Sequence, residues 1–138
     1  MRRLTFLLLL ALSACLQPLH RYALSPLSGT DEERTPALAH AFAAAGAEPE
    51  VTDARLAMVA STWQTPYGSS QGSTWTRRWV ATFDQLGAVT IRAEIKICRV
   101  FQGCTDLKGE AAPQDIDALD EFAHEVARSL NVAVNVVP

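Results

Sequence analysis

Basic residues are too few in this sequence for a typical nucleic-acid-binding protein. Lysine and arginine together number 12 against 15 aspartate and glutamate residues, which gives a net charge of −3. Binding to DNA or RNA depends largely on neutralising phosphates, so we expect no nucleic-acid partner. A chain of 138 residues with 49% hydrophobic and 20% charged side chains fits one folded domain. It does not fit a disordered protein or a membrane protein with many spans.

The motifs of common catalytic and cofactor sites are also absent. The sequence contains no GxSxG, HExxH, P-loop or GxGxxG pattern. None of the three histidines, His20, His40 and His124, lies in a recognisable motif. Glu121 and His124 have Glu-x-x-His spacing, but a metal site of that type needs a second such pair, which the sequence lacks. We therefore expect a protein that is not an enzyme and that holds no metal or cofactor.

No hydrophobic run is long enough for a membrane span, but residues 1–14 predict a secretory signal peptide. Arg2 and Arg3 form a basic start, and residues 4–12 are rich in leucine. Nine residues rise about 14 Å as a helix, roughly half of the hydrocarbon core. A basic start, an apolar centre and small residues at the end are typical of export signals. Cleavage would leave ten basic against 15 acidic residues, a net charge of about −5.

The end of this segment, Leu12-Ser13-Ala14-Cys15, resembles the lipobox of bacterial lipoproteins. The resemblance covers about 15 of the 138 residues. It implies that the Cys15 thiol receives a diacylglycerol, that cleavage occurs just before Cys15 and that the new amino group is acylated. Each buried methylene contributes ~0.8 kcal/mol, so two or three acyl chains would anchor the protein stably. The alternative is an ordinary cleavable signal in which Cys15 has no special role.

Leu16 follows the cysteine, where an aspartate often marks lipoproteins retained in the inner membrane. The resemblance therefore favours anchoring in the outer membrane, facing the periplasm.

If Cys15 carries lipid, Cys98 and Cys104 remain as a pair in an oxidising compartment. Gly103 can supply the turn between them, and closing so short a loop would stabilise the fold by ~2 kcal/mol in the chain-entropy model. The spacing is not that of a CxxC motif, and no histidine or second CxxC lies nearby. We predict a structural disulfide; two free thiols, or a metal or redox role, are the alternatives.

Residues 75–97 alternate apolar and polar side chains, which predicts an antiparallel hairpin covered on one face. A three-residue loop would place Gly87 where a type I turn with a bulge needs a left-handed residue. On the polar face, Arg78 then falls opposite Glu94, an attractive cross-strand pair. The predicted register pairs Phe83 with Val89, Ala81 with Ile91, Trp79 with Ala93 and Arg78 with Glu94.

Other segments complete the predicted fold. One helix is expected at 35–45, with Thr35 as N-cap and Pro36 at the first helical position. A second helix is expected at 115–130, and Asn131 would end it. Residues 55–63 predict a preceding strand, and residues 132–137 a final one. Residues 64–73 predict an exposed loop.

The expected architecture is α+β, with two helices packed on one face of a three- or four-stranded, mainly antiparallel sheet. The expected organisation is a signal peptide at 1–14, a lipidated N-terminus and tether at 15–34, and a single domain at 35–138. Within the tether, residues 21–24 could form a short strand.

One cluster could be a binding surface: Trp75, Arg77 and Trp79, with Tyr67 in the neighbouring loop. Tryptophan and arginine together can stack on sugars or contact anionic headgroups. The alternative is that Trp79 belongs to the core and Trp75 covers the edge of the sheet. Arg77 keeps both interpretations open, because alternation places this charged residue on the apolar face.

Behind the lipobox, the order helix, three strands, helix is similar to lipopolysaccharide-assembly lipoproteins and to the transport-auxiliary lipoproteins of envelope ABC systems. Arg21-Tyr22-Ala23-Leu24-Ser25-Pro26 is similar to the opening strand of the auxiliary family. The resemblance implies a non-catalytic interaction module or accessory subunit with an envelope protein partner, anchored to the membrane through Cys15. The alternative is a lipoprotein that binds a small molecule or lipid in a pocket between the sheet and the helices.

Overall fold

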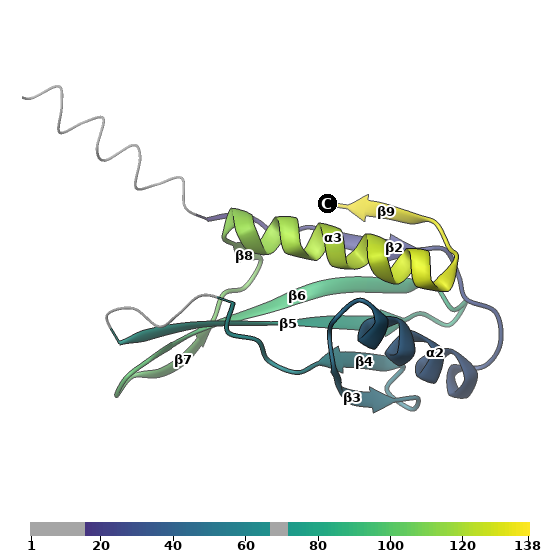
Figure 1. Cartoon of the computed structure of the whole chain (residues 1–138), viewed down its shortest axis with the longest axis horizontal. Helices are drawn as coiled ribbons and strands as arrows, with labels where there is room; N and C mark the ends of the chain where they lie inside the picture. The colour runs from purple at the N-terminus through teal and green to yellow at the C-terminus, as the bar shows by residue number, and fades with distance from the viewer. Residues whose placement is uncertain (1–15, 67–71) are drawn as a thin grey trace, which may run out of the picture.

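Two helices and an antiparallel sheet make up residues 16–66 and 72–138, the part of the chain that the computed structural model describes (Figure 1). The α+β class is confirmed, but the main sheet has seven strands and not three or four, and a two-stranded sheet lies beside it. The order in the main sheet is β3-β4-β5-β6-β2-β9, and β7 also pairs with β6. The helices are α2 (Asp31–Ala44) and α3 (Pro113–Leu130). The strands are β1 (Gln17–Pro18), β2 (Arg21–Leu24), β3 (Pro49–Asp53), β4 (Met58–Ser61), β5 (Ser73–Phe83), β6 (Val89–Arg99), β7 (Gly103–Asp106), β8 (Glu110–Ala111) and β9 (Val134–Val137).

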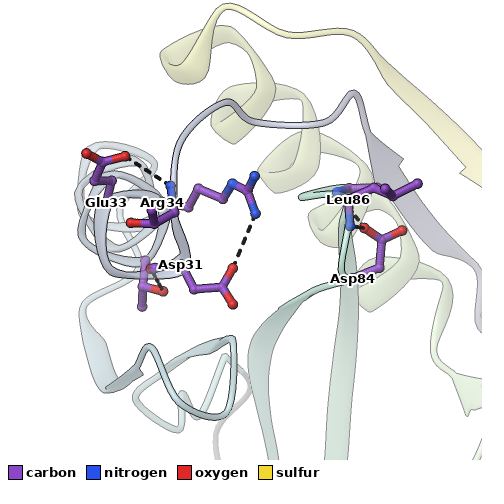
Figure 2. Close-up of polar contacts among 8 residues, drawn as sticks. Asp31, Glu33, Arg34, Asp84 and Leu86 are labelled. Atoms are coloured by element: carbon purple, nitrogen blue, oxygen red, sulfur yellow. Dashed lines mark hydrogen bonds and ion pairs between the residues drawn. The ribbon is translucent and has the colours of Figure 1, made fainter.

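The long hairpin β5–β6 forms the centre of the sheet, and its predicted register is confirmed at all four pairs. In the turn, Gly87 has a φ of 83°, the left-handed conformation that the bulge requires. The Asp84 carboxylate accepts hydrogen bonds from the backbone N–H groups of Leu86 (2.8 Å) and Ala88 (2.9 Å), and the first of these is visible in Figure 2. The side-chain alternation and the turn therefore specify the same register.

One edge of β6 pairs with β5. The opposite edge, here called the second edge of β6, pairs with two strands in succession. Leu24 and Tyr22 of β2 lie opposite Val89 and Ile91, whereas β7 pairs with residues 96–99 at the other end. Beyond the helices, β5, β6 and β7 project together as an arm (Figure 1). β6 is long enough, at eleven residues, to serve both partners.

The predicted tether over residues 15–34 needs correction in its described part. β2, predicted there as a short strand, lies inside the sheet between β6 and β9, and its Tyr22 and Leu24 are buried. β1 pairs with β8, just before α3. The four residues of β2 bury alternate side chains against the helices, and this burial holds the segment in the fold.

Helix α2 begins four residues before the predicted start at Thr35. Thr30 is the N-cap, and its backbone N–H donates to the Glu33 carboxylate at 3.0 Å. Pro36 lies inside the helix and removes one backbone donor, while the Thr35 hydroxyl donates to the Asp31 carbonyl at 2.6 Å. The capping interaction at Thr30 outweighs the preference of proline for the first helical position.

The strand predicted at 55–63 is shorter than expected, and β3 was not predicted. β4 covers only Met58–Ser61, and a turn at 54–57 joins it to β3. Ala57 in that turn has a φ of 48°.

The final strand was predicted correctly: β9 lies at residues 134–137 and pairs with β2.

Both helices cover the same face of the sheet, as predicted. Phe122 of α3 lies edge-on to Phe42 of α2, with ring centroids 4.9 Å apart, and stacks on Trp79 of β5 at 5.4 Å. α3 ends at Leu130, and Asn131 is its C-cap, whose left-handed φ of 54° confirms its predicted role as the stop. These three rings join the two helices and the sheet in one core.

Candidate functional site

The predicted cluster on β5 is organised around a residue that the sequence did not single out, Asp115. Trp75 donates its indole Nε1–H to Asp115 Oδ2 at 2.8 Å, and Arg77 donates from Nη1 to Asp115 Oδ1 at 2.8 Å. The Asp115 side chain is completely buried, and that of Arg77 is 14% exposed. One carboxylate from the first turn of α3 therefore neutralises the arginine that alternation places on the apolar face.

The position of Asp115 in the first turn of α3 adds to this pairing, because the N-terminus of a helix favours negative charge. The sequence does contain an indication that Arg77 has an acidic partner. An arginine on the inner face of a strand needs a buried acidic partner, and Asp115 is an acidic residue at the start of the helix that packs on that face. The sequence offered several acidic residues in this region, so the partner could not be chosen from the pattern.

Trp79 belongs to the core. It is 4% exposed and stacks on Phe122, and the Arg77 guanidinium lies 4.9 Å from the centre of its ring. Trp75 is partly buried and packs against the core. The structure thus brings Trp75, Arg77 and Trp79 together on the inner face of β5. Tyr67 lies outside the described residues.

A small hollow of about 260 Å³ remains between the sheet and the helices beside Trp79. Its lining includes Arg77, Phe122, Glu121 and Glu125. Pockets for small-molecule ligands usually measure about 300–1,000 Å³. The hollow is smaller than that range.

Cys98 and Cys104 form the predicted disulfide bond. They lie directly opposite each other on β6 and β7, so the bond closes the end of the projecting arm. The turn that it closes carries two exposed apolar side chains, Val100 and Phe101. Phe101 has a left-handed φ of 64°, which directs the turn back into β7. Cys15, the predicted site of lipidation, lies outside the described residues.

The two strands at the ends of the order β3-β4-β5-β6-β2-β9 differ in chemistry. β3 starts with Pro49 and carries Glu50 and Asp53, features that protect an edge from pairing with another chain. β9 has the sequence Val-Asn-Val-Val without a charge, and Val136 is 53% exposed. The edge of β9 is therefore the less protected of the two.

Within residues 16–66 and 72–138, no group of three or more His, Cys, Asp or Glu side chains is arranged to hold a metal ion. In that same part of the chain, neither helix has the length and the apolar character that crossing a membrane requires. The His124 ring contacts the Asp120 carbonyl through Nδ1 at 2.8 Å on the exposed side of α3.

No protein-family model matches the chain, and no curated protein sequence matches it either.

Proposed function

We propose that the protein is a lipid-anchored lipoprotein of the bacterial envelope, and that its folded domain is a non-catalytic interaction module. In this role it would be an accessory subunit of an envelope assembly or transport system, held at the outer membrane through Cys15 and facing the periplasm. The lipobox-like residues 12–15 support the anchor, and Leu16 supports the outer membrane. The Cys98–Cys104 disulfide is consistent with an oxidising compartment.

The observation that carries the interaction role is the open edge of β9. An uncharged edge strand presents unpaired backbone groups to which an extended segment of a partner can add as a further strand. Val136 and Val137 are exposed along this edge, whereas β3 at the opposite edge is protected by proline and acidic residues. We propose that an extended segment of a larger envelope protein pairs with β9.

The register of β9 tells which of its backbone groups face the partner. Ser25 N donates to the Ala133 carbonyl at 3.0 Å, so Ala133 points its backbone groups toward β2. Because the direction alternates along an antiparallel strand, Asn135 and Val137 also point toward β2. Val134 and Val136 point their N–H groups outward, where a partner strand would accept them.

The anchor is tested by replacing Cys15 in the full chain. We expect the wild-type protein to fractionate with membranes and to have a mass that includes acyl chains, whereas C15S should lack both properties. The double variant C98S/C104S is the matched control, because it also loses cysteine but keeps Cys15. A wild-type mature chain without acyl mass, or one starting elsewhere than Cys15, would refute the anchor.

The docking role is tested at Val136. V136P removes an outward N–H and leaves the bonds to β2 in place, since proline is tolerated at such edge positions. V136T keeps the N–H and serves as the control. In native mass spectrometry of protein gently extracted from its own membranes, the wild type and V136T should carry a second protein that V136P lacks. Equal occupancy in all three, or no partner in any, would argue against docking at β9.

A further inference from the structure

A second and larger hollow, of about 470 Å³, opens on the face of the sheet away from the helices. It lies where the second edge of β6 changes partner. β2 pairs with β6 only as far as Ile91, and β7 begins to pair at Lys96. Ala93 lies between these two points, and neither β2 nor β7 pairs with it. The hollow occupies this gap in the sheet, and we call it the sheet-gap hollow.

The backbone of β6 is directed into this gap. Leu107 N donates to the Ile95 carbonyl at 2.9 Å, so Ile95 points its backbone groups toward the second edge of β6. Ala93, two residues earlier, points its N–H and carbonyl the same way. Its amide thus provides a hydrogen-bond donor at the floor of the sheet-gap hollow, which Ala93 and Ile95 both line.

The side chains around the sheet-gap hollow are strongly basic. Five of the 12 lysine and arginine residues line it, against two of the 15 acidic residues. The local balance is therefore +3, in a chain whose net charge is −3. The basic residues are Arg21, Arg78, Arg92, Lys96 and Lys108, and the acidic ones are Glu94 and Asp106.

The internal ion pairs leave part of this positive charge unbalanced. Arg78 and Arg92 share a single carboxylate, that of Glu94, at 2.7 Å and 2.9 Å. Within the described residues, Arg21, Lys96 and Lys108 form no ion pair. A negatively charged ligand would supply the counter-charge that the chain's own carboxylates do not.

Trp63 orders two of these cations. The Lys96 ammonium lies 4.3 Å from the centre of its ring, and the Arg78 guanidinium lies 4.7 Å from it. Cation–π contacts of this kind hold the side chains in place without neutralising them. The Lys96 charge therefore stays available, whereas Arg78 still shares the Glu94 carboxylate with Arg92. Both side chains lose less freedom when a ligand binds.

We propose that the sheet-gap hollow binds an anion bearing phosphate groups. Its volume lies within the range of small-molecule sites, and arginine guanidinium groups match phosphate oxygens with paired hydrogen bonds. A surplus of three positive charges suits a ligand with more than one negative charge. The same chemistry could be a free phosphate compound or the headgroup of an anionic phospholipid. This site lies on the face away from the helices and does not depend on docking at β9.

The test uses the purified full chain in dodecyl maltoside at constant ionic strength. Isothermal titration with inorganic pyrophosphate probes a free anion. Titration with mixed micelles that contain phosphatidylglycerol probes a headgroup, and phosphatidylcholine micelles are the uncharged comparison. The hollow variant R21Q/K108Q removes two charges that have no ion pair. The control variant R55Q/R128Q removes two charges from exposed side chains outside the hollow.

We expect one of the two probes to bind, with about tenfold weaker affinity in the hollow variant and unchanged affinity in the control variant. Saturable binding of pyrophosphate supports a free phosphate compound. Binding of phosphatidylglycerol micelles alone, without phosphatidylcholine binding, supports a lipid headgroup. The proposal is overturned if neither probe binds, or if the hollow and control variants weaken binding equally. No partner protein is present, so failure here is distinguishable from failure of docking at β9.

Discussion

Arg77 of β5 and Asp115 of α3 form an ion pair across the interface between the sheet and the helices. Arg77 Nη1 lies 2.8 Å from Asp115 Oδ1, and the carboxylate is fully buried. Trp75 donates to the other carboxylate oxygen, so a single side chain accepts hydrogen bonds from two neighbouring residues on the inner face of β5. The pair explains how a charged residue can occupy the apolar side of the central hairpin.

Replacement of Asp115 should strongly destabilise the protein. In D115N, the Arg77 charge stays largely buried without a counter-charge, and breaking such a pair typically costs 3–5 kcal/mol. Arg77 keeps slight exposure, so we expect the free energy of unfolding to fall by about 3 kcal/mol, measured by urea denaturation. D117N, two residues along at an exposed position, should change it by less than about 0.5 kcal/mol. Similar losses in both variants would show that the ion pair contributes little.

Loss of the Cys98–Cys104 bond should loosen the projecting arm. The bond joins residues that face each other on β6 and β7, and its removal in C98S/C104S should lower the free energy of unfolding by ~2 kcal/mol. Limited proteolysis should then cut the turn at 99–103 faster than in the wild type. Equal cleavage rates would show that strand pairing alone holds the arm closed.

A side chain at Gly87 should destabilise the turn of the central hairpin. A Cβ at this position would lie 2.6 Å from both Arg34 Cζ and the Leu27 carbonyl oxygen. Arg34 reaches from α2 toward this turn, as Figure 2 shows, and it is held by an ion pair with Asp31 at 3.3 Å. The Arg34 side chain therefore has little room to move away from a Cβ at position 87.

Gly46 provides a matched control for Gly87. Both residues have left-handed φ angles, 84° and 83°, but a Cβ at Gly46 meets no atom within 4 Å. G46A should cost about 1 kcal/mol for the backbone conformation alone. G87A should cost at least about 1 kcal/mol more, from overpacking against Arg34 and Leu27. Equal losses in thermal or urea unfolding would contradict the steric argument.

Stability should fall at high pH because of Tyr22. Burial, the hydrogen bond that its hydroxyl donates to Asp120 at 2.8 Å, and the negative charges of Asp120 and Asp117 raise the pKa of Tyr22 to about 12. The ordinary tyrosine pKa is 10.0, so the unfolded chain loses this proton first. The contribution is fully present below about pH 10 and is lost as the pH rises through about 12.

The magnitude follows from the shift in the pKa of Tyr22. A change of about two units corresponds to roughly 2–3 kcal/mol between the two protonation states. Urea unfolding at about pH 9 and about pH 11.5 should show a decline in the wild type that Y22F lacks. Y22F itself should cost about 1 kcal/mol at neutral pH, through loss of the hydrogen bond. Parallel pH profiles for both proteins would rule out Tyr22 as the cause.

The sequence by itself determined the local features of the fold. Alternation and the Gly87 turn specified the pairing of β5 with β6, because a one-residue slip would turn apolar side chains to water. The apolar stripe and Asn131 specified α3. The spacing of Cys98 and Cys104 indicated their disulfide. All of these depend on residues close together along the chain, and simple periodic rules describe them.

Only the tertiary structure decided which distant segments meet. The choice of Asp115 as the partner of Arg77, 38 residues away, depends on where α3 crosses the sheet. The position of β2 between β6 and β9, within a segment predicted as a tether, depends on burial against the helices. The sheet-gap hollow exists because β2 and β7 share one edge of β6 without meeting. Such long-range arrangements result from packing of whole elements, which no local pattern encodes.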